Sequence, residues 1–455
     1  MSTVLMLCHD QHLDRRVVAQ AVSLIQRGHK VKLLALSFDT ETTHEITPEG
    51  IELTRIGLSF VVPENPTYTE YMTRQQRLNG LLNSASNRWS TRTLLLQRGF
   101  AISSRINWHS YRAKLLMRYR NRRLHDPLPF RHAFVSHAPA EAPDIVQVHD
   151  LPALQAGVEL SGRWQVPLIY DAHELYPEQR SFSRAQRAIC SEAEKLLIGK
   201  ADLVFAVNES IADEMATRYS IDKPVVLTNA IDPHPTFNPN ERHDLLRQKL
   251  QLPTTRKLLL LQGGFSPHRN LNELVAAMRR VRTADINLVM MGFGEYGELL
   301  KATAAKLDLL NKNVHFLPAV PQSELLQHSA SADLGIIPYP HVDLNSYYCT
   351  PNKLFEFIQA GLPILANDSP ELRRFVVEND FGMVHGMPNP PAIANAIDIA
   401  FERLSTATWK DNLMSSRSNF SWKIQDSVYI ARIDELLTTN QLSRGSSKAH
   451  HTKEV

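Results

Sequence analysis

The chain has 455 residues, a formal net charge of +3, 43% hydrophobic residues and 21% charged residues. This length exceeds what one hydrophobic core usually serves, so we expect two globular domains. The three cysteines form no CxxC pair, which argues against a disulfide framework, and no apolar run reaches the ~20 residues of a membrane-spanning helix. The first residues lack the basic leader of a signal peptide, so we expect a cytoplasmic protein, peripheral on the cytosolic face of a membrane if it meets one.

The first half of the chain alternates short apolar runs with amphipathic stretches. Val4–Cys8 predicts a strand, and Val17, Ala21 and Leu24 recur at helical spacing before Gly28, where the helix should end. Further strands are expected at residues 31–36, 51–56, 144–148, 168–170, 203–207 and 225–227. Strands separated by helices are typical of a doubly wound parallel sheet, so we predict a Rossmann-like domain over residues 1–232.

Residues 86–131 form a basic segment inside that domain, within a helical excursion expected over residues 70–135. The segment holds eleven Arg and Lys residues and a single acid, Asp126, with aromatic residues between the charges. Such a stretch suits an anionic membrane surface or a phosphate-bearing acceptor. The alternative is a solvated helical excursion whose aromatic residues pack on the domain. Nucleic acid is not an expected partner.

A second series of strands and helices follows a proline-rich stretch. Pro233, Pro235 and Pro239 give residues 233–240 the composition of a linker, and we place the domain boundary there. The second Rossmann-like domain is predicted over residues 241–420, with strands at residues 257–261, 287–291, 314–317, 333–337 and 363–366. Residues 421–440 indicate a helix, and the polar residues 441–455 a disordered tail.

Polar residues and glycines follow the predicted strands of both domains. Open parallel sheets bind ligands outside the carboxyl ends of their strands, so these positions are candidate site residues. In the first half they are His9, Asp10, His149, Asp150, Asp171, His173, Glu174, Asn208 and Asn229. In the second half they are Gly263, Gly264, Gly292, Gly294, Tyr339, Asn367 and Asp368. Strand-to-helix turns use Gly, Asn and Asp for structural reasons as well, but together these positions favour a ligand cleft between two domains.

The stretch from Thr350 onward carries the most specific pattern in the chain. Thr350 is the expected N-cap of a short helix, and Pro351 its expected first residue. The free N–H groups at the start of such a helix suit a diphosphate. Glu356 lies about one turn into the helix, where its carboxylate could accept hydrogen bonds from ribose hydroxyls. The alternative is a solvent-facing glutamate with Lys353 as its i−3 partner.

Pro351–Pro363, followed by Ser369-Pro370-Glu371-Leu372, resembles the nucleotide-sugar site of the retaining GT-B glycosyltransferases of family 4. Other stretches agree with that family in their order along the chain, namely residues 170–174, 227–232, 263–269, 292–295 and 420–422. The resemblance implies an α/β fold of two Rossmann-like domains that face a cleft. It also implies that the C-terminal helix crosses back to the N-terminal domain.

The resemblance assigns roles by position. The residues expected to bind the nucleotide-sugar are Gly264, Arg269, Gly292, Gly294, Thr350, Asn352, Lys353 and Glu356. His173 would contact the transferred sugar, and Asp150 or Glu174 would orient or deprotonate the acceptor. The cations and the helix start would stabilise the charge that develops on the diphosphate leaving group. The family further implies transfer with retention to a glycan or lipid-linked acceptor, no required metal, and no cofactor besides the donor substrate.

Three departures from the family pattern concern the donor site. The first of the family's two spaced glutamates, which contacts the transferred sugar, aligns with Tyr348. The usual arginine of the diphosphate turn aligns with Gly264, and the usual lysine with Arg269, so Lys353 would supply the missing charge.

Other functions remain open at the level of sequence. A nucleotide-sugar epimerase can share this two-domain build, whereas a phosphorylase lacks support because no lysine context fits a pyridoxal cofactor. A non-catalytic scaffold that binds a nucleotide-sugar is favoured by the missing glutamate. The retained His173, Arg269, Lys353 and Glu356 argue for an enzyme instead.

Overall fold

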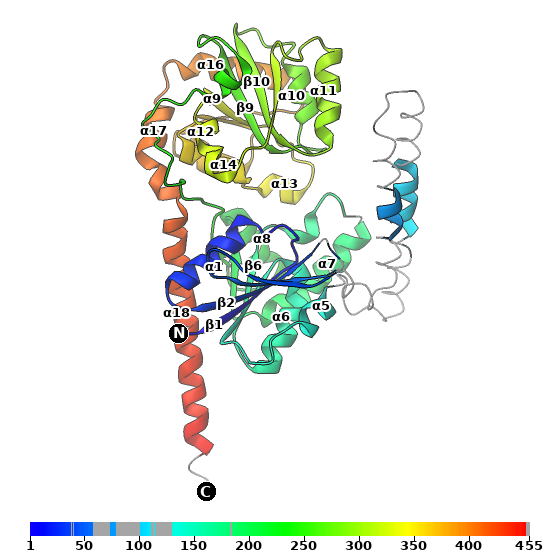
Figure 1. Ribbon diagram of the computed structural model, residues 1–455, viewed down its shortest axis with the longest axis vertical. Coiled ribbons are helices and arrows are strands. Elements are labelled where there is room, and N and C mark those ends of the chain that lie inside the picture. Colours follow the sequence, from blue (N-terminus) through cyan, green and yellow to red (C-terminus); the bar gives the residue numbers. More distant parts are fainter. Residues whose placement is uncertain are drawn as a thin grey trace. The chain divides into compact units, whose positions relative to one another are not determined.

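The computed structural model describes residues 1–37, 39, 41–57, 73–78, 101–110, 113, 130–182 and 184–451 (Figure 1). It divides into two compact units, one formed by Met1–Phe205 with Arg432–Val455 and the other by Ala206–Ala431. The proline-rich stretch at residues 233–240 lies inside the second unit. Most of the basic segment 86–131 lies outside the described residues, and residues 101–110 within it are helical.

The first sheet has the strand order β3-β4-β2-β1-β5-β6-β7-β8. Its strands are β1 (Thr3–Cys8), β2 (Lys30–Leu36), β3 (Thr43–Ile46), β4 (Glu52–Ile56), β5 (Ile145–His149), β6 (Leu168–Ala172), β7 (Leu203–Ala206) and β8 (Val225–Val226). β1 pairs in parallel with β2 and β5, and β5 with β6, whereas the unpredicted β3 pairs antiparallel with β4. The parallel centre therefore places the carboxyl ends of β1, β5 and β6 side by side.

Helix α1 (Arg15–Gln26) begins where Asp14, its N-cap, accepts a hydrogen bond from the backbone N–H of Arg16. The buried face of this helix includes Arg16, Gln20 and Leu24, at i, i+4 and i+8. The first unit also contains α5 (Arg131–Ser136), α6 (Leu151–Trp164) and α7 (Arg184–Leu197). The helical spacing of α1 therefore places the polar side chains of Arg16 and Gln20 on its buried face.

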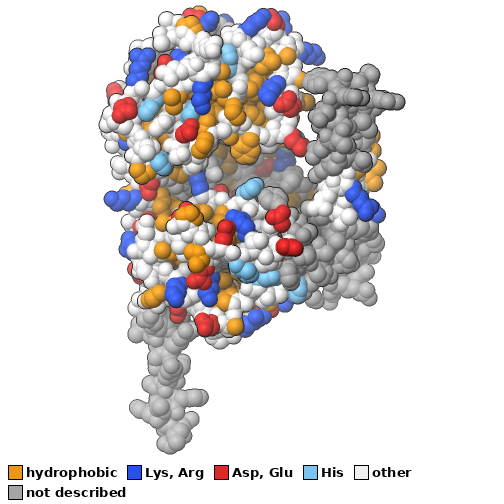
Figure 2. Space-filling model, viewed as in Figure 1, with side chains coloured by type: hydrophobic (Ala, Val, Ile, Leu, Met, Phe, Trp, Pro, Cys, Tyr) orange, Lys and Arg blue, Asp and Glu red, His pale blue; other side chains and the backbone are white. Residues whose placement is uncertain are grey.

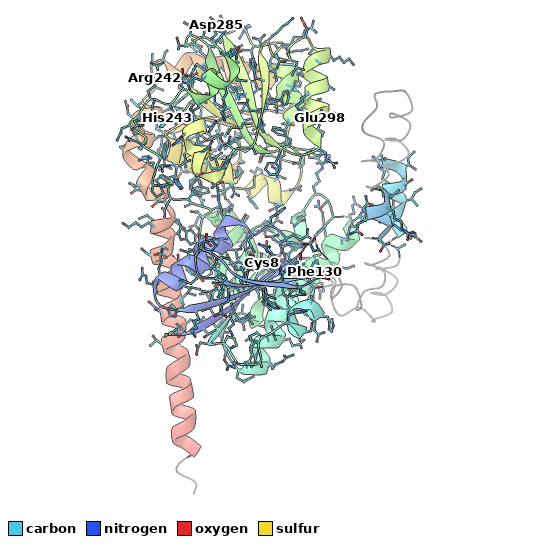
Figure 3. All side chains as sticks on the ribbon, viewed as in Figure 1. Cys8, Phe130, Arg242, His243, Asp285 and Glu298 are labelled. Carbon is cyan, nitrogen blue, oxygen red and sulfur yellow. The ribbon has the colours of Figure 1, made fainter. Side chains whose placement is uncertain are left out.

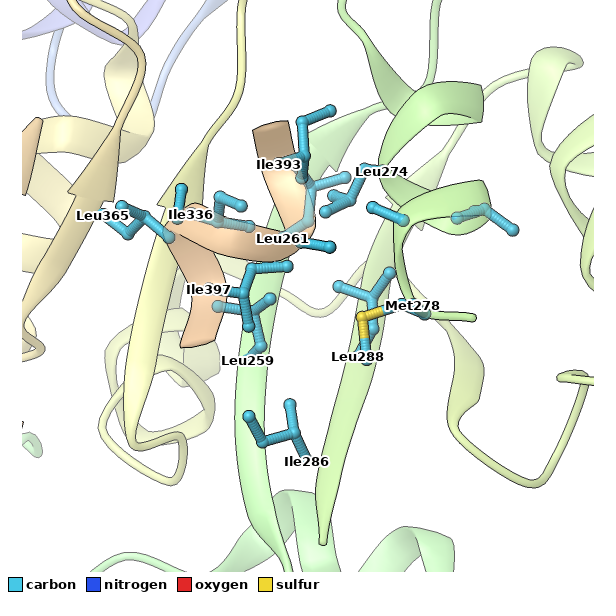
Figure 4. Close-up of a cluster of buried hydrophobic side chains, with 14 of the residues drawn as sticks. Leu259, Leu261, Leu274, Met278, Ile286, Leu288, Ile336, Leu365, Ile393 and Ile397 are labelled. Carbon is cyan, nitrogen blue, oxygen red and sulfur yellow. The ribbon is translucent and has the colours of Figure 1, made fainter. Parts of the chain in front are cut away.

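The second sheet has the order β11-β10-β9-β12-β13-β14, and all of its pairs are parallel. Its strands are β9 (Lys257–Gly264), β10 (Ile286–Phe293), β11 (Val314–Pro318), β12 (Leu334–Ile337), β13 (Ile364–Ala366) and β14 (Gly382–Val384). Figure 4 shows Leu259, Leu261 and Leu288 of these strands packed with side chains of two helices, among them Leu274 and Ile397. This core fixes the strand ends that follow it.

The helices of the second unit precede, connect and follow these strands. They are α8 (Glu209–Tyr219), α9 (Leu245–Leu250), α10 (Leu271–Ala277), α11 (Tyr296–Lys306), α12 (Gln322–Ser329), α13 (Leu344–Tyr348), α14 (Asn352–Ala360), α15 (Pro370–Leu372), α16 (Pro390–Leu404) and α17 (Trp409–Ser416). Figure 2 shows positive and negative side chains interspersed on the visible face of each unit, in keeping with the net charge of +3.

The last helix, α18, runs from Trp422 to His451 and is shared between the units, because the division assigns its residues from Arg432 onward to the first unit. The prediction of a disordered tail from residue 441 is therefore wrong up to His451. Polar composition removed the apolar periodicity there, but residues 441–451 include no proline to stop the helix.

Although α18 has 30 residues, neither it nor another helix in the described ranges combines the length and the apolar character needed to cross a bilayer.

Candidate functional site

The first unit holds a buried polar cluster around Asp171, at the end of β6. Arg16 of α1 donates to both carboxylate oxygens of Asp171, from Nε at 3.0 Å and from Nη2 at 2.5 Å. Gln20, one turn further along α1, donates to Oδ2 at 2.7 Å and accepts from Gln147 of β5. Burial alone would raise the pKa of Asp171, but the charges of Arg16 and His173 hold that pKa well below its usual range. Asp171 is thus a fixed carboxylate.

Two histidines meet at this carboxylate. His173 Nε2 lies 3.2 Å from Asp171 Oδ2 and 3.2 Å from His149 Nδ1, and His149 Nδ1 lies 3.3 Å from the same oxygen. Burial lowers the pKa of His149. Burial would also lower the pKa of His173, but Asp150 and Asp171 outweigh it and raise that pKa to about 9. Near neutral pH the pair is therefore an imidazole beside an imidazolium.

Asp150, which precedes α6, faces His173 from the other side. Its Oδ1 accepts from the backbone N–H of His173 at 2.9 Å, and its Oδ2 lies 3.8 Å from His173 Nδ1. Asp150 has a backbone φ of +60°, a conformation that non-glycine residues adopt at a cost and that is found at functional sites. Burial raises the pKa of Asp150 to about 8, against the opposing effect of the His173 charge. A carboxyl group of this kind can exchange a proton near neutral pH.

The remaining predicted residues of this cluster lie at its edge. Glu174 is half-buried and accepts from Gln179 Nε2 at 2.5 Å. The ring of His9 lies 5.9 Å from that of Tyr176 and 6.2 Å from that of Phe130, next to Cys8 at the end of β1 (Figure 3). The structure therefore brings His149, Asp150, Asp171 and His173 into direct contact, whereas Glu174 points to a neighbouring side chain.

The geometry of this cluster also resembles a metal site. Ligand atoms of His149, Asp171 and His173 lie within 4.8 Å of one another. The chemistry does not fit, because both oxygens of Asp171 already accept charge-assisted hydrogen bonds from Arg16. A metal ion would have to compete with a buried guanidinium for the same carboxylate.

The second unit carries the predicted donor residues on α14 and the neighbouring strands. Glu356 is 8% exposed, so its interpretation as a solvent-facing residue is wrong. Its Oε2 accepts from Gln262 Nε2 of β9 at 2.5 Å, and Gln262 Oε1 in turn accepts from Ser329 of α12 at 2.7 Å. A chain of buried polar contacts therefore fixes the orientation of this carboxylate.

The start of α14 differs by one residue from the prediction. Pro351 is the N-cap and Asn352 the first helical residue, so Thr350 is not the cap. The side chain of Thr350 instead accepts from Asn208 Nδ2 at 3.3 Å, and the same amide donates to the backbone carbonyl of Tyr348 at 2.7 Å. Asn352 accepts from Asn229 Nδ2 at 3.1 Å. Two asparagines therefore hold the loop that leads into α14.

The glycine turns leave room for backbone but not for side chains. A Cβ atom on Gly292 would lie 1.9 Å from the carbonyl oxygen of Gly263, and Gly294 has a φ of +120°. The ends of β9 and β10 thus approach each other through their backbones, with a hydrogen bond of 2.6 Å from Phe265 N–H to the carbonyl of Phe293. The ends of β9 and β10 therefore leave no space for a side chain at Gly292.

Two predicted cations converge on Tyr339, which follows β12. Lys353 Nζ lies 4.8 Å from the centre of the Tyr339 ring, and the guanidinium carbon of Arg269 lies 5.1 Å from it. Arg269 Nη1 also donates to Tyr339 Oη at 3.2 Å and to the carbonyl of Gly264 at 3.3 Å. Lys353 is only 6% exposed, yet among the described residues neither cation has an acidic partner.

Tyr348, at the position of the missing family glutamate, ends α13. It is half-buried, burial raises the pKa of its hydroxyl, and its ring lies 5.2 Å from that of Tyr347. Its backbone carbonyl is bound by Asn208, as described above. An aromatic pair therefore occupies this part of the donor loop.

Three residues of these clusters, Arg16, Gln20 and Gln262, were not among the predicted site residues. Arg16 and Gln20 share the buried face of α1 with Leu24, and that spacing is visible in the sequence. Gln262 is a single amide in the apolar run of β9, which is another detectable signal because buried amides need partners.

Comparisons with known proteins agree with this architecture. Residues 13–230 match the glycosyl transferase 4-like domain, and residues 243–407 match the glycosyl transferases group 1 domain. The break between the two matches contains the proline-rich stretch 233–240. D-inositol 3-phosphate glycosyltransferase of Corynebacterium glutamicum is 23% identical over 295 residues, covering 61% of this chain and 69% of the relative. The enzyme of the same name from Geodermatophilus obscurus is 24% identical, covering 66% and 68%.

Solved structures show the same fold at low sequence identity. Sucrose-phosphate synthase of Thermosynechococcus elongatus has a TM-score of 0.64 at 16% identity, covering 99% of this chain and all of that one. Anabaena HepE, solved with UDP and glucose, has a TM-score of 0.60 at 14% identity, covering 96% and 100%. With both family models matched in order along most of its length, the chain belongs to the GT-B glycosyltransferases built from a 4-like domain and a group 1 domain.

Proposed function

We propose that this glycosyltransferase moves a sugar from a nucleotide-diphosphate donor to a glycan or lipid-linked acceptor, with retention of the anomeric configuration. The observation that carries the proposal is Lys353, a buried ammonium beside Arg269 with no acidic partner in the described part of the chain. Buried charges are normally paired, so a site with two unpaired cations favours an anionic ligand. A diphosphate supplies that anion.

The donor residues divide the work on the nucleotide. Arg269, Lys353 and the free N–H groups at the start of α14 stabilise the diphosphate as negative charge develops on it during bond cleavage. Glu356, held in place by Gln262, accepts hydrogen bonds from the ribose hydroxyls. Gly292 and Gly294 have no side chain, and a Cβ at either position would clash with nearby backbone. The donor can therefore lie against backbone at this end of the sheet.

The first-unit cluster acts on the sugar and the acceptor in this proposal. His173, an imidazolium with a pKa of about 9, donates a hydrogen bond to the transferred sugar. Asp150, with a pKa raised to about 8, takes the proton of the acceptor hydroxyl once it has itself been deprotonated. Glu174 is the second candidate for orienting the acceptor. No metal is required, because side-chain cations supply the positive charge at the diphosphate.

The names of the relatives suggest the first ligands to test. HepE has been solved with UDP-glucose, and the curated relatives act on D-inositol 3-phosphate, so UDP-sugars and a phosphorylated polyol are suitable starting points. The missing glutamate at Tyr348 leads us to expect a different sugar preference from that of family members that retain it.

The test is donor binding, measured by the shift in thermal stability that each donor produces. UDP-, GDP- and ADP-sugars are screened against the wild type and against Glu356→Gln, Lys353→Met and Lys257→Met. Lys257, exposed at the opposite end of β9, is the matched control. A donor at 100 times its Kd should stabilise the wild type and the control by about 2.7 kcal/mol. The two site variants should show a clearly smaller shift, and a wild type that no donor stabilises would contradict the proposal.

Product analysis separates the competing functions. Incubation of the bound donor with acceptors should give a glycosylated product whose anomeric configuration is read by NMR. Isomerised donor without transfer would indicate an epimerase, and donor binding without any product would support the scaffold.

A lipid-linked acceptor gives the basic segment 86–131 a role. We infer that its cations bind an anionic membrane surface near such an acceptor. The test is sedimentation with anionic vesicles of the wild type and of a variant in which Arg118, Arg120, Arg122 and Arg123 are neutralised. Equal binding by both proteins would refute the membrane role without affecting the donor site.

A further inference from the structure

Tyr339, predicted only as one of the polar residues that follow strands, contacts both of the cations that have no acidic partner in the described ranges. The centre of its ring lies 4.8 Å from Lys353 Nζ and 5.1 Å from the guanidinium carbon of Arg269. Its hydroxyl oxygen accepts a hydrogen bond from Arg269 at 3.2 Å. One side chain therefore contacts both of the positive charges that the donor site offers.

The backbone of Tyr339 is itself fixed. Asn367, after β13, donates from Nδ2 to the carbonyl of Tyr339 at 2.7 Å, and its Oδ1 accepts from the backbone N–H of Met387 at 2.9 Å. Asn367 is buried, so these bonds are shielded from water. The ring is thus carried by a segment tied to the neighbouring strand.

Two like charges in one site repel each other, and this repulsion grows as water is removed. The negative face of an aromatic ring attracts cations and offsets part of the repulsion without neutralising either charge. An acidic residue in the same place would also hold the cations, but it would compete with an anionic ligand. A tyrosine keeps them together and leaves them available.

The hydroxyl group adds a directional contact. Since Tyr339 Oη accepts from Arg269, its own hydrogen remains to be donated, and among the described residues no acceptor for it is found. A phosphate oxygen is a strong acceptor for such a donor.

We propose that Tyr339 is a positioning residue that holds Lys353 and Arg269 as a preformed pair of cations and orients Arg269 toward the donor diphosphate. This inference rests on the proposed function. It predicts that Tyr339 contributes to recognition of the phosphates and not to recognition of the nucleoside.

The experiment measures binding by calorimetry of UDP, GDP and ADP and of the matching nucleosides, with the full chain. Tyr339→Leu removes the ring, and Tyr339→Phe removes only the hydroxyl. For the nucleotide that the wild type binds, we expect Tyr339→Leu to weaken diphosphate binding at least about tenfold. The affinity of Tyr339→Phe for this nucleotide should lie between those of Tyr339→Leu and the wild type. Nucleoside binding should stay unchanged in both variants.

Controls separate this effect from misfolding. Circular dichroism and the Tm report on the fold of each variant. Arg256→Ala removes a half-buried arginine that pairs with Asp285 before β9, at the opposite end of the strand, where no change in binding is expected. The inference is wrong, while the proposed function stands, in either of two cases. In the first, Tyr339→Leu weakens nucleoside binding as much as nucleotide binding; in the second, it weakens neither. If the wild type binds none of the nucleotides, both are wrong.

Discussion

Arg16 and Asp171 form a bidentate ion pair whose side chains are 1% and 0% exposed. The pair joins α1 to the end of β6 across 155 residues of sequence. Asp171 also contacts His149 and His173, so the position of both histidines depends on this pair. The charge that supports the imidazolium of His173 is thus supplied by a residue that is itself anchored by α1.

Substitution of Asp171 should be strongly destabilising. Asp171→Asn leaves the Arg16 guanidinium buried without its counter-charge, and removal of one partner from such a pair costs about 3–5 kcal/mol of unfolding free energy. The measurement is urea denaturation. Glu159→Gln, which removes a half-exposed partner of Arg131 and Arg163, is the control and should cost less than about 1 kcal/mol. Equal losses in the two variants would show that Asp171 is not the anchor.

His149 and His173 should have clearly different pKa values. NMR of the imidazole groups should show the pKa of His149 below its usual value, and that of His173 raised to about 9. His173 binds its proton more tightly in the folded state, so its contribution to stability is complete below pH 6.5 and is lost as pH rises toward 9. Asp150, with its raised pKa, changes stability in the same direction up to about pH 8. The stability of His173→Gln should therefore fall less between pH 6.5 and 9, and a fall equal to that of the wild type would contradict the assignment.

The glycine turn at the end of β10 should not tolerate a methyl group. Gly292→Ala would place Cβ 1.9 Å from the carbonyl oxygen of Gly263, so the turn must shift. We expect a loss of donor binding and a lower Tm. Gly162→Ala in α6 is the matched control, because its Cβ would meet no atom within 4 Å. That substitution should stabilise the protein by roughly 0.5–1 kcal/mol.

Removal of metal ions should leave activity intact. In the proposed reaction Arg269 and Lys353 stabilise the leaving group, and Arg16 occupies the carboxylate of the cluster that could otherwise bind a metal. Transfer assayed after treatment with EDTA should proceed at the untreated rate. A loss of activity that one divalent ion restores would instead place a metal in the mechanism.

The fold and part of the donor site could be predicted from local patterns. Apolar runs that alternate with amphipathic stretches predict the parallel sheets. Both patterns can be recognised because each depends only on residues that are close together in sequence. Glu356 and Lys353 stood out because a proline and a glycine mark the helix that carries them. The helix pattern could not predict their surroundings, because Gln262 lies 94 residues before Glu356 and Tyr339 follows a different element, β12.

The errors have physical causes as well. Thr350 has the composition of an N-cap, but Asn208 binds its hydroxyl from 142 residues away, and the helix starts after Pro351. The inward turn of Arg16 was hidden by the usual expectation that arginine lies on the solvent face of a helix. The carboxylate of Asp171 neutralises the guanidinium of Arg16 in the interior, and no rule based on neighbouring residues predicts that partner.

The division of α18 has a consequence for the synthesis of the protein. The first unit needs residues from Arg432 onward, among them the buried Ile433 and Leu437, although its sheet begins at Thr3. During synthesis, therefore, residues 1–205 cannot complete their core until the second unit, Ala206–Ala431, has been made as well. The second unit is continuous in sequence and has all its residues earlier, so on the ribosome the two units should mature in the reverse of the order in which they begin.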